Sequence, residues 1–198
     1  GQSGRHSKAK NASQKAVALS PQDEEARNNL GNTLRELGRL NEAESSYTQA
    51  IALKPDYAEA HNNLGNTLKE LGRLDEAEAS YTHAIALKPD YAEAYNNLGT
   101  TLKELGRLDE AEASYMHAIA LKPDYSEVYN NLGVTFQELG RIEEALANYN
   151  EAIELKVDFF KAYSNKNLCL NYSSNWELLF IYHQHLEFEK QFGGSRIR

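Results

Sequence analysis

The sequence predicts an all-α protein built as an array of repeated helical hairpins. All four prolines, Pro21, Pro55, Pro89 and Pro123, stand 34 residues apart, and a fixed period of this length is typical of helical repeat proteins. Two consecutive units, residues 58–91 and 92–125, differ at only three positions. Because one unit of this size cannot bury its own apolar face, neighbouring units must stabilise one another.

Composition limits the class of protein and of partner. The chain has 198 residues and 41% hydrophobic content, which is enough to form a core. Its 29 acidic and 21 basic residues give a net charge of -8, so we expect binding to neither nucleic acid nor an anionic membrane. The single cysteine, Cys169, excludes an internal disulfide. With no signal peptide and no long apolar run visible, we expect a cytoplasmic protein.

The N-terminal elements are a tail and half of a repeat. We expect residues 1–8 to be a vector-derived remnant without fixed structure. Residues 9–23 are predicted to form a half repeat that contributes a second helix only, because Ala16, Val17 and Leu19 match the later second helices. Ser13 stands where those helices carry tyrosine. More repeats are therefore expected to precede this one.

Four full units follow, at residues 24–57, 58–91, 92–125 and 126–159. In the second of them, apolar residues recur at helical spacing through residues 58–71 and again through residues 74–87. Gly72 separates the two helices, at a place where a left-handed C-cap favours glycine. The equivalent glycines are Gly38, Gly106 and Gly140.

A second glycine series lies inside the first helix of each unit, at Gly31, Gly65, Gly99 and Gly133. Glycine costs a helix interior about 1 kcal/mol relative to alanine, so a close helix approach is expected there. The predicted contacts are the small residues of the second helices, namely Ala43, Ala77, Ala111 and Ala145, followed by Ala50, Ala84, Ala118 and Ala152.

The array is predicted to end within residues 160–192. Residues 160–170 match a first helix, but Lys166 and Asn167 replace its leucine and glycine. A capping box from Ser174 to Glu177 then opens one more amphipathic helix, which we expect to cover the last repeat. Residues 193–198 are predicted to be a tail.

Together these positions closely resemble the tetratricopeptide repeat (TPR). Each unit has adjacent leucine and glycine in the first helix, then alanine, an aromatic residue, alanine and proline in and after the second. The aromatic residues are Tyr47, Tyr81, Tyr115 and Tyr149. The resemblance implies a right-handed superhelical solenoid of antiparallel helix pairs, in which the first helices line a concave groove.

Adjacent asparagines in each first helix are the strongest candidate for a functional site. Asparagine costs a helix interior roughly 0.5 kcal/mol, yet the pair recurs in one register. A helical wheel places both members with nearby glutamates on a strip away from the apolar face. We call the second members, Asn29, Asn63, Asn97, Asn131 and Asn165, the asparagine ladder, and we call Glu25, Glu59, Glu93 and Glu127 the acidic row. The strip also contains Asn28, Asn62, Asn96 and Asn130, together with Asn32 and Asn66.

The ladder is predicted to bind an extended polypeptide. Each amide both donates and accepts hydrogen bonds, as a peptide backbone requires. Adjacent helices pack about 8–10 Å apart and an extended chain advances roughly 3.3–3.6 Å per residue, so one asparagine meets about every third guest residue. The acidic row is expected to favour hydroxyl-bearing or basic guests.

Three other interpretations were weighed. The asparagines could be solvated residues copied by recent duplication. A carboxylate clamp for chaperone tails needs lysine or arginine in the strip, and Asn28, Asn62, Glu93 and Asn97 hold those places instead. Self-assembly through exposed repeat ends and surfaces is the main alternative function, because uncapped terminal repeats tend to associate.

The asparagine ladder beside an acidic row is similar to the repeat domain of the protein O-linked N-acetylglucosamine transferases and their SPINDLY-like bacterial relatives. That resemblance implies a substrate-recruiting region of a glycosyltransferase whose catalytic part lies elsewhere. We expect no enzyme activity, cofactor or metal in this chain, because it contains no phosphate-binding or metal-binding motif. His83 and His117 are interpreted as surface residues. The expected partner is a polypeptide or protein, with a homo-oligomer as a further possibility.

Overall fold

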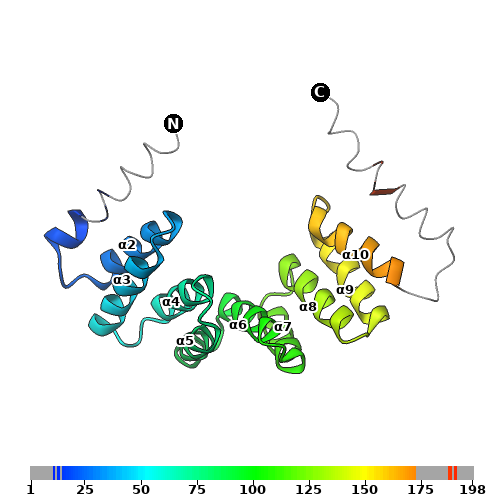
Figure 1. Ribbon diagram of the computed structural model, residues 1–198, viewed down its shortest axis with the longest axis horizontal. Coiled ribbons are helices and arrows are strands. Elements are labelled where there is room, and N and C mark those ends of the chain that lie inside the picture. The colour runs from blue at the N-terminus through cyan, green and yellow to red at the C-terminus, as the bar shows by residue number, and fades with distance from the viewer. Residues whose placement is uncertain (1–10, 12, 14, 173–186, 189, 191–198) are drawn as a thin grey trace. The chain divides into compact units, whose positions relative to one another are not determined.

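The computed structural model describes residues 11, 13, 15–172, 187, 188 and 190 (Figure 1). Among these residues every regular element is a helix, which confirms the all-α prediction. A helical stretch at residues 15–19 precedes α2 (Glu24–Glu36), α3 (Leu40–Leu53), α4 (Ala58–Glu70), α5 (Leu74–Leu87), α6 (Ala92–Glu104), α7 (Leu108–Leu121), α8 (Ser126–Glu138), α9 (Ile142–Leu155) and α10 (Phe160–Tyr172). The predicted remnant at residues 1–8, the tail at residues 193–198 and most of the predicted capping helix lie outside the described residues.

Each hairpin turns at a glycine in the left-handed region. Gly72 has φ 76° between α4 and α5, and its amide donates to the carbonyl of Lys69 at 2.9 Å. The amide of Arg73 donates to the carbonyl of Leu68 at the same distance. These two bonds satisfy carbonyls at the end of α4 that have no partner within the helix. The glycine C-cap prediction is therefore confirmed, with φ between 70° and 76° at the four equivalent positions.

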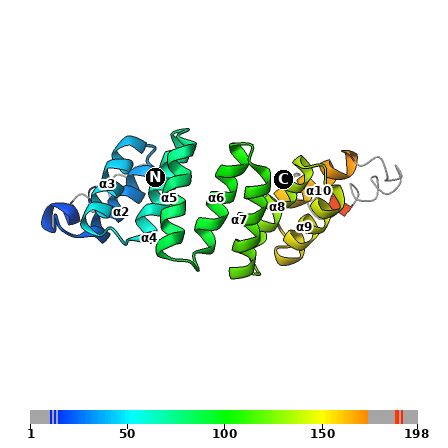
Figure 2. The same ribbon diagram turned by 90° about the horizontal axis from the view of Figure 1, so that it is seen from below.

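The chain divides into two compact units, Gly1–Gly106 and Arg107–Arg198. In the first unit, α2 packs on α3 and α4 on α5 within repeats, while α3 packs on α4 and α5 on α6 between repeats. Figures 1 and 2 show the α2–α3 pair beside the α4–α5 pair from two directions. In the second unit, α7 packs on α8, α8 on α9 and α9 on α10.

The core of three repeats contains a tyrosine ring laid over a glycine. Tyr47, Tyr81 and Tyr149 are fully buried, and a Cβ added to the glycine opposite would lie 2.5–2.7 Å from the tyrosine Cε1 atom. The opposed glycines are Gly31, Gly65 and Gly133. The predicted close approach therefore exists. At Gly133 the alanine expected to meet the glycine, Ala145, also lies close, with its carbonyl oxygen 3.2 Å from the added Cβ, but the tyrosine ring is the nearest group at all three positions. Because the tyrosine ring fills this space, the opposite residue must be glycine, which has no Cβ.

Candidate functional site

The two members of an asparagine pair lie in different environments in three of the four repeats, whereas Asn96 and Asn97 are both half-buried. Asn28, Asn62 and Asn130 are buried, with exposed fractions of 6%, 1% and 1%. Asn29 is exposed, and Asn63, Asn97, Asn131 and Asn165 of the ladder are half-buried. The helical wheel placed both members on one outward strip, and the structure corrects this for the three buried asparagines. A wheel considers one helix alone, whereas these side chains are covered by other parts of the array.

Hydrogen bonds join the buried asparagines to the ladder of the following repeat. In the first unit, Asn63 Nδ2 donates to Asn28 Oδ1 and Asn97 Nδ2 donates to Asn62 Oδ1, both at 3.0 Å. In the second unit, Asn165 Nδ2 donates to Asn130 Oδ1 at 2.9 Å. The partners are 35 residues apart in every case. The asparagine pairs therefore link successive first helices as well as forming a candidate binding surface.

The buried asparagines differ in their remaining contacts. The side chain of Asn28 lies near Tyr57 and lowers the pKa of its hydroxyl, which burial and the nearby carboxylates, first among them Glu25, raise overall. Asn62 Nδ2 is buried and has no hydrogen-bond partner among the described residues. Asn62 is therefore held chiefly through its oxygen, which accepts from the ladder.

Lysines that follow the second helix of the same repeat neutralise part of the acidic row. Lys88 Nζ donates to Glu59 Oε1 at 2.9 Å, and this bond lowers the pKa of Glu59 and raises that of Lys88. Lys156 Nζ lies 3.4 Å from Glu127 Oε1. The Lys88 ammonium also sits 4.8 Å from the centre of the Tyr91 ring, within cation–π range. The surface beside the ladder is therefore zwitterionic at Glu59 and Glu127 rather than simply acidic.

Asn32 and Asn66, also predicted as site residues, accept hydrogen bonds from buried tyrosines. Tyr47 and Tyr81 donate their hydroxyls to Asn32 Oδ1 and Asn66 Oδ1, each at 2.8 Å. Both asparagines are half-buried. Their oxygens satisfy the only polar group of a side chain that is otherwise packed in the core, which gives them a structural role in addition to the predicted one.

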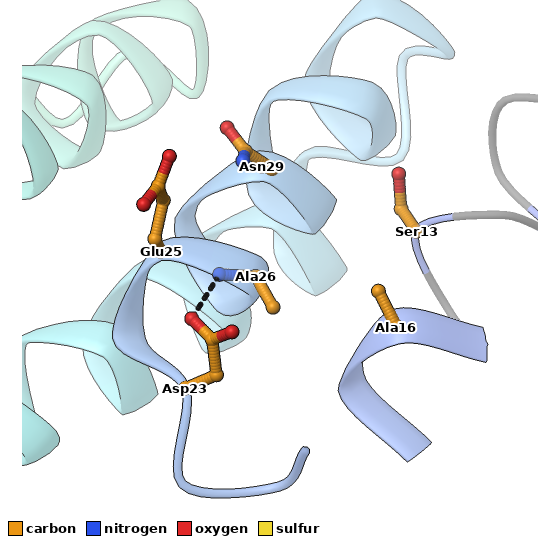
Figure 3. Close-up of a pocket in the computed structure, with 6 residues that line it drawn as sticks. All are labelled: Ser13, Ala16, Asp23, Glu25, Ala26 and Asn29. Atoms are coloured by element: carbon orange, nitrogen blue, oxygen red, sulfur yellow. Dashed lines mark hydrogen bonds between the residues drawn. The ribbon is translucent and has the colours of Figure 1, made fainter. Parts of the chain in front are cut away.

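At its N-terminal end the ladder borders an open cavity of about 370 Å³ (Figure 3). Asp23, Glu25 and Asn29 line it from the start of α2, where Asp23 Oδ1 also accepts from the amide of Ala26 at 2.8 Å. Ser13 lines it from the preceding helical stretch and contacts the hydroxyl of Thr33 at 3.2 Å. This end of the candidate site offers carboxylate, amide and hydroxyl oxygens.

Sequence reasoning missed a histidine pair on the other side of the first helices. The rings of His61 and His83 are stacked with centres 4.9 Å apart, and His61 Nε2 lies 3.1 Å from the carbonyl oxygen of Pro55. Burial lowers the pKa of His61, the contact with the Pro55 carbonyl opposes this, and the neighbouring His83 ring adds to the lowering. The sequence offered one signal for this pair: His61 is one of the three positions at which two near-identical repeats differ.

Within the described ranges, no three histidine, cysteine, aspartate or glutamate side chains are grouped so as to hold a metal ion. None of the helices in those ranges has the length and apolar character needed to cross a membrane. The described residues thus form a helical-repeat protein whose candidate site is a polar surface on the first helices.

Comparison with known protein families identifies the repeat. The family described as "Tetratricopeptide repeat" matches residues 56–124 and 90–156, and a second family of that description matches residues 12–45. A family described as "TPR repeat" matches residues 31–72. The chain therefore belongs to the tetratricopeptide-repeat family. No curated protein sequence matches it.

Solved structures of TPR proteins share the fold. MamA is 28% identical, with a TM-score of 0.71 over 79% of this chain and 91% of that one. A thermophilic TPR protein from Thermus thermophilus, TTC0263, is also 28% identical, with a TM-score of 0.70 over 85% of this chain and 92% of that one. YrrB, described as a TPR protein with an unusual peptide-binding site, is 21% identical, with a TM-score of 0.73 over 94% and 98% of the two chains. These neighbours support a protein-interaction scaffold of TPR type.

Proposed function

We propose that this chain is a binding scaffold that holds an extended polypeptide along the asparagine ladder. The observation that carries the proposal is the repeated hydrogen bond between a ladder asparagine and the buried asparagine of the preceding repeat, at 2.9–3.0 Å in three places. These bonds hold successive amides at a constant place in each repeat. A regular series of amides suits a guest whose own repeating unit is the peptide bond.

Each ladder amide keeps hydrogen-bonding capacity for a guest. An asparagine side chain has two N–H donors and an oxygen with two acceptor sites. Asn63, Asn97 and Asn165 each use one donor on the preceding repeat. The second N–H and the oxygen remain available in principle to a guest carbonyl and a guest amide. Each such bond would contribute about 0.5–1.5 kcal/mol net, so affinity would build up over several repeats.

The lysine pairs alter the expected guest. A strongly basic guest would have to compete with Lys88 for Glu59 and with Lys156 for Glu127. Hydroxyl-bearing guests need only share hydrogen bonds with these groups. We therefore propose a neutral extended polypeptide rich in serine and threonine as the preferred guest, rather than a basic one.

The finer identity of the parent protein rests on the resemblance described above. The Asn/Glu-lined surface suits the substrate-recruiting region of a cytoplasmic glycosyltransferase, with the transferase chemistry carried outside the TPR repeats. YrrB is described as having a peptide-binding site, which supports peptide binding as a use of this fold. At 21% identity that likeness concerns the fold, so the proposal depends on the residues of this chain.

The test is a fluorescence titration with a panel of end-blocked peptides that are serine/threonine-rich, lysine-rich or glutamate-rich. We expect the whole chain to bind the serine/threonine-rich peptides most tightly. The triple variant Asn63→Ala, Asn97→Ala, Asn131→Ala should bind them at least about tenfold more weakly, because several guest hydrogen bonds of about 0.5–1.5 kcal/mol are lost together.

A matched control is Thr82→Ala, Met116→Ala, Asn150→Ala. These exposed residues lie at equivalent positions of three second helices, so this variant should bind as the wild type does. Circular dichroism establishes that both variants remain helical. Equal binding by the wild type and the ladder variant, or no binding by the wild type, would refute the proposed function.

Self-assembly through the repeat ends is a second candidate, favoured by exposed apolar side chains. Leu19 is 75% exposed beside the N-terminal end of the described helices, and Phe160 and Leu168 of α10 are 52% and 51% exposed. Light scattering at increasing protein concentration distinguishes the two functions. A concentration-dependent oligomer that Leu19→Ser or Leu168→Ser disrupts would favour assembly, whereas a monomer would leave peptide binding as the function.

A further inference from the structure

We propose that Asn28, Asn62 and Asn130 are positioning residues that fix which way the ladder amides face, and that they thereby make the site read a guest chain in one direction. This inference rests on the proposed function and concerns the same surface. It assigns the buried asparagines a role that direct guest contact cannot give them, since only 1–6% of each side chain is exposed.

The first step is the orientation of the amide. An asparagine side chain presents an N–H group on one side and an oxygen on the other, and rotation by about 180° exchanges them. Asn63 and Asn97 each direct Nδ2 at an oxygen of the preceding repeat. Rotation would bring two oxygens together and lose the bond. The buried oxygen therefore selects one of the two orientations.

The second step is that the orientation repeats. The same bond, between residues 35 apart, occurs twice in the first unit and once in the second. In each unit the nitrogen faces the preceding repeat and the oxygen is left for other partners. A peptide main chain is itself directional, because its N–H and C=O groups follow in a fixed order. Ladder amides that all face one way can form hydrogen bonds with a guest main chain that runs in one direction. A main chain that runs the other way would place donors opposite donors and acceptors opposite acceptors.

Asn62 indicates that the buried side chain is present for its oxygen. Its Nδ2 atom is buried without a hydrogen-bond partner among the described residues, and an unsatisfied buried donor is unfavourable. A residue selected for stability alone would avoid this cost. Asparagine at position 62 is explained if the site needs its oxygen, which accepts the hydrogen bond from Asn97, and does not need its nitrogen.

The orientation step can be tested without a guest, on the intact wild-type chain. Side-chain amide exchange is followed by NMR, with signals assigned from the Asn29→Ala, Asn63→Ala and Asn97→Ala spectra. Asn29 is the internal reference, because it is exposed and has no asparagine partner among the described residues. We expect the amides of Asn63 and Asn97 to exchange roughly two- to tenfold more slowly than that of Asn29, as a hydrogen bond would require. Equal rates would overturn the proposal.

The reading step uses one serine/threonine-rich peptide, blocked at both ends, with a nitroxide spin label at its N-terminal end in one sample and at its C-terminal end in the other. A guest held in one direction brings each label to one end of the ladder. We therefore expect the ratio of signal broadening near Asn29 to that near Asn97 to differ about tenfold between the two samples of the wild type, because several mismatched hydrogen bonds disfavour the opposite direction. The Asn28→Leu, Asn62→Leu variant should give the same ratio in both samples. The Asn28→Asp, Asn62→Asp variant keeps an acceptor oxygen for Asn63 and Asn97, so it should retain the difference.

The ratio separates positioning from mere stabilisation. Partial unfolding weakens binding of both labelled peptides equally and leaves the difference between the two samples unchanged, so a leucine variant that keeps this difference would overturn the proposal. If the leucine variant does not fold, the wild-type exchange rates and the aspartate variant still decide it. If the wild type binds neither peptide, the proposed function and the directional reading both fail, while slow exchange at Asn63 and Asn97 would still establish the orienting role.

Discussion

At the residue scale, Gly65 sets how closely two helices of one repeat can approach. A Cβ at this position would lie 2.7 Å from Cε1 and 2.9 Å from Cδ1 of Tyr81, closer than carbon atoms can pack. Because Tyr81 is fully buried, its ring has no open space into which it can move. The glycine is thus a packing requirement, and its helix-propensity cost is the smaller effect.

Replacing Gly65 with alanine is therefore expected to destabilise the protein. Alanine improves helix propensity by about 1 kcal/mol. Overpacking a filled core, however, costs about 1–3 kcal/mol, and a contact this short adds strain to that cost. We expect a net loss of about 1–2 kcal/mol in urea unfolding. The control is Gly65→Ala with Tyr81→Leu, in which the clash is relieved and alanine should become favourable. A stabilising single substitution would contradict this packing account.

The second residue-scale feature is the stacked pair of His61 and His83, which makes stability depend on pH. Burial lowers the pKa of His61 below its ordinary value of 6.5. The unfolded chain therefore binds a proton at a higher pH than the folded chain does. The stability that this pair contributes is present above about pH 6.5 and is lost as the pH falls toward the folded pKa of His61.

We predict that His61→Tyr reduces this loss. Tyrosine is the residue that the near-identical following repeat carries at the equivalent position, Tyr95. The measurement is thermal unfolding of both proteins between about pH 7.5 and 5.5, an interval that spans the ordinary histidine pKa. Over this interval the melting temperature of the wild type should fall further than that of the variant. Parallel curves would show that His61 is not the group responsible.

At the element scale, a buried tyrosine hydroxyl ties a second helix to the first helix of its own repeat. Tyr81 of α5 donates to Asn66 Oδ1 of α4 at 2.8 Å, and Tyr149 of α9 donates to Gln137 Oε1 of α8 at 2.9 Å. Burial raises the pKa of Tyr81, so the hydroxyl stays protonated and can donate. One hydrogen bond thereby joins the two helices of a repeat inside its core.

Tyr81→Phe is expected to lower stability by about 1 kcal/mol, because it removes a hydrogen bond and leaves Asn66 without its donor. The control is Asn66→Thr, which places in α4 the residue that the following repeat carries as Thr100. That variant keeps an acceptor for the tyrosine and should cost less. Chemical denaturation of the three proteins measures their stabilities, which should fall in the order wild type, Asn66→Thr, Tyr81→Phe. A Tyr81→Phe variant as stable as the wild type would contradict this account.

Charged side chains make a similar tie between second helices. Arg73, at the start of α5, bonds to both carboxylate oxygens of Glu44 in α3 at 2.8 Å and also to Glu76 in its own helix. Arg141 likewise pairs with Glu112 and Glu144 in the second unit. The arginines are more than a third exposed, while Glu44 and Glu112 are partly buried, so we regard these pairs as setting the register of neighbouring repeats rather than as a main source of stability.

At the scale of the whole molecule, stability comes from contacts between neighbouring helices. In the first unit, α4 and α5 pack against helices on both sides, whereas the stretch at residues 15–19 lies at the N-terminal end of the described array. In a linear repeat protein, stability is approximately a sum of repeat and nearest-neighbour terms. Terminal helices should therefore open more readily than internal ones.

Backbone hydrogen exchange tests this expectation. We predict protection factors in α4 and α5 at least about tenfold higher than in residues 15–19, because opening an internal helix breaks two interfaces and opening a terminal one breaks fewer. The rates are compared at two pH values to establish that they report opening equilibria. Uniform protection along the chain would instead indicate one fully cooperative unit.

The sequence allowed most of the fold to be predicted because its signals are local. The predicted helices at residues 58–71 and 74–87 correspond to α4 and α5 within one residue. Gly72 has the positive φ that its position predicted. Helical periodicity, glycine at a left-handed turn and proline after a helix each act within a few residues, so one sequence is enough to detect them.

The contacts between repeats could be decided only by the tertiary structure. The sequence alone determined that the chain is all-α, that its period is 34 residues and that asparagine pairs recur in one register. It could not show that Asn28 and Asn62 are buried and receive hydrogen bonds from the next repeat, or that tyrosine fills the space above Gly65. Those facts depend on side chains brought together from positions 16 to 35 residues apart, and the packing of helices, rather than any local preference, decides which of them meet.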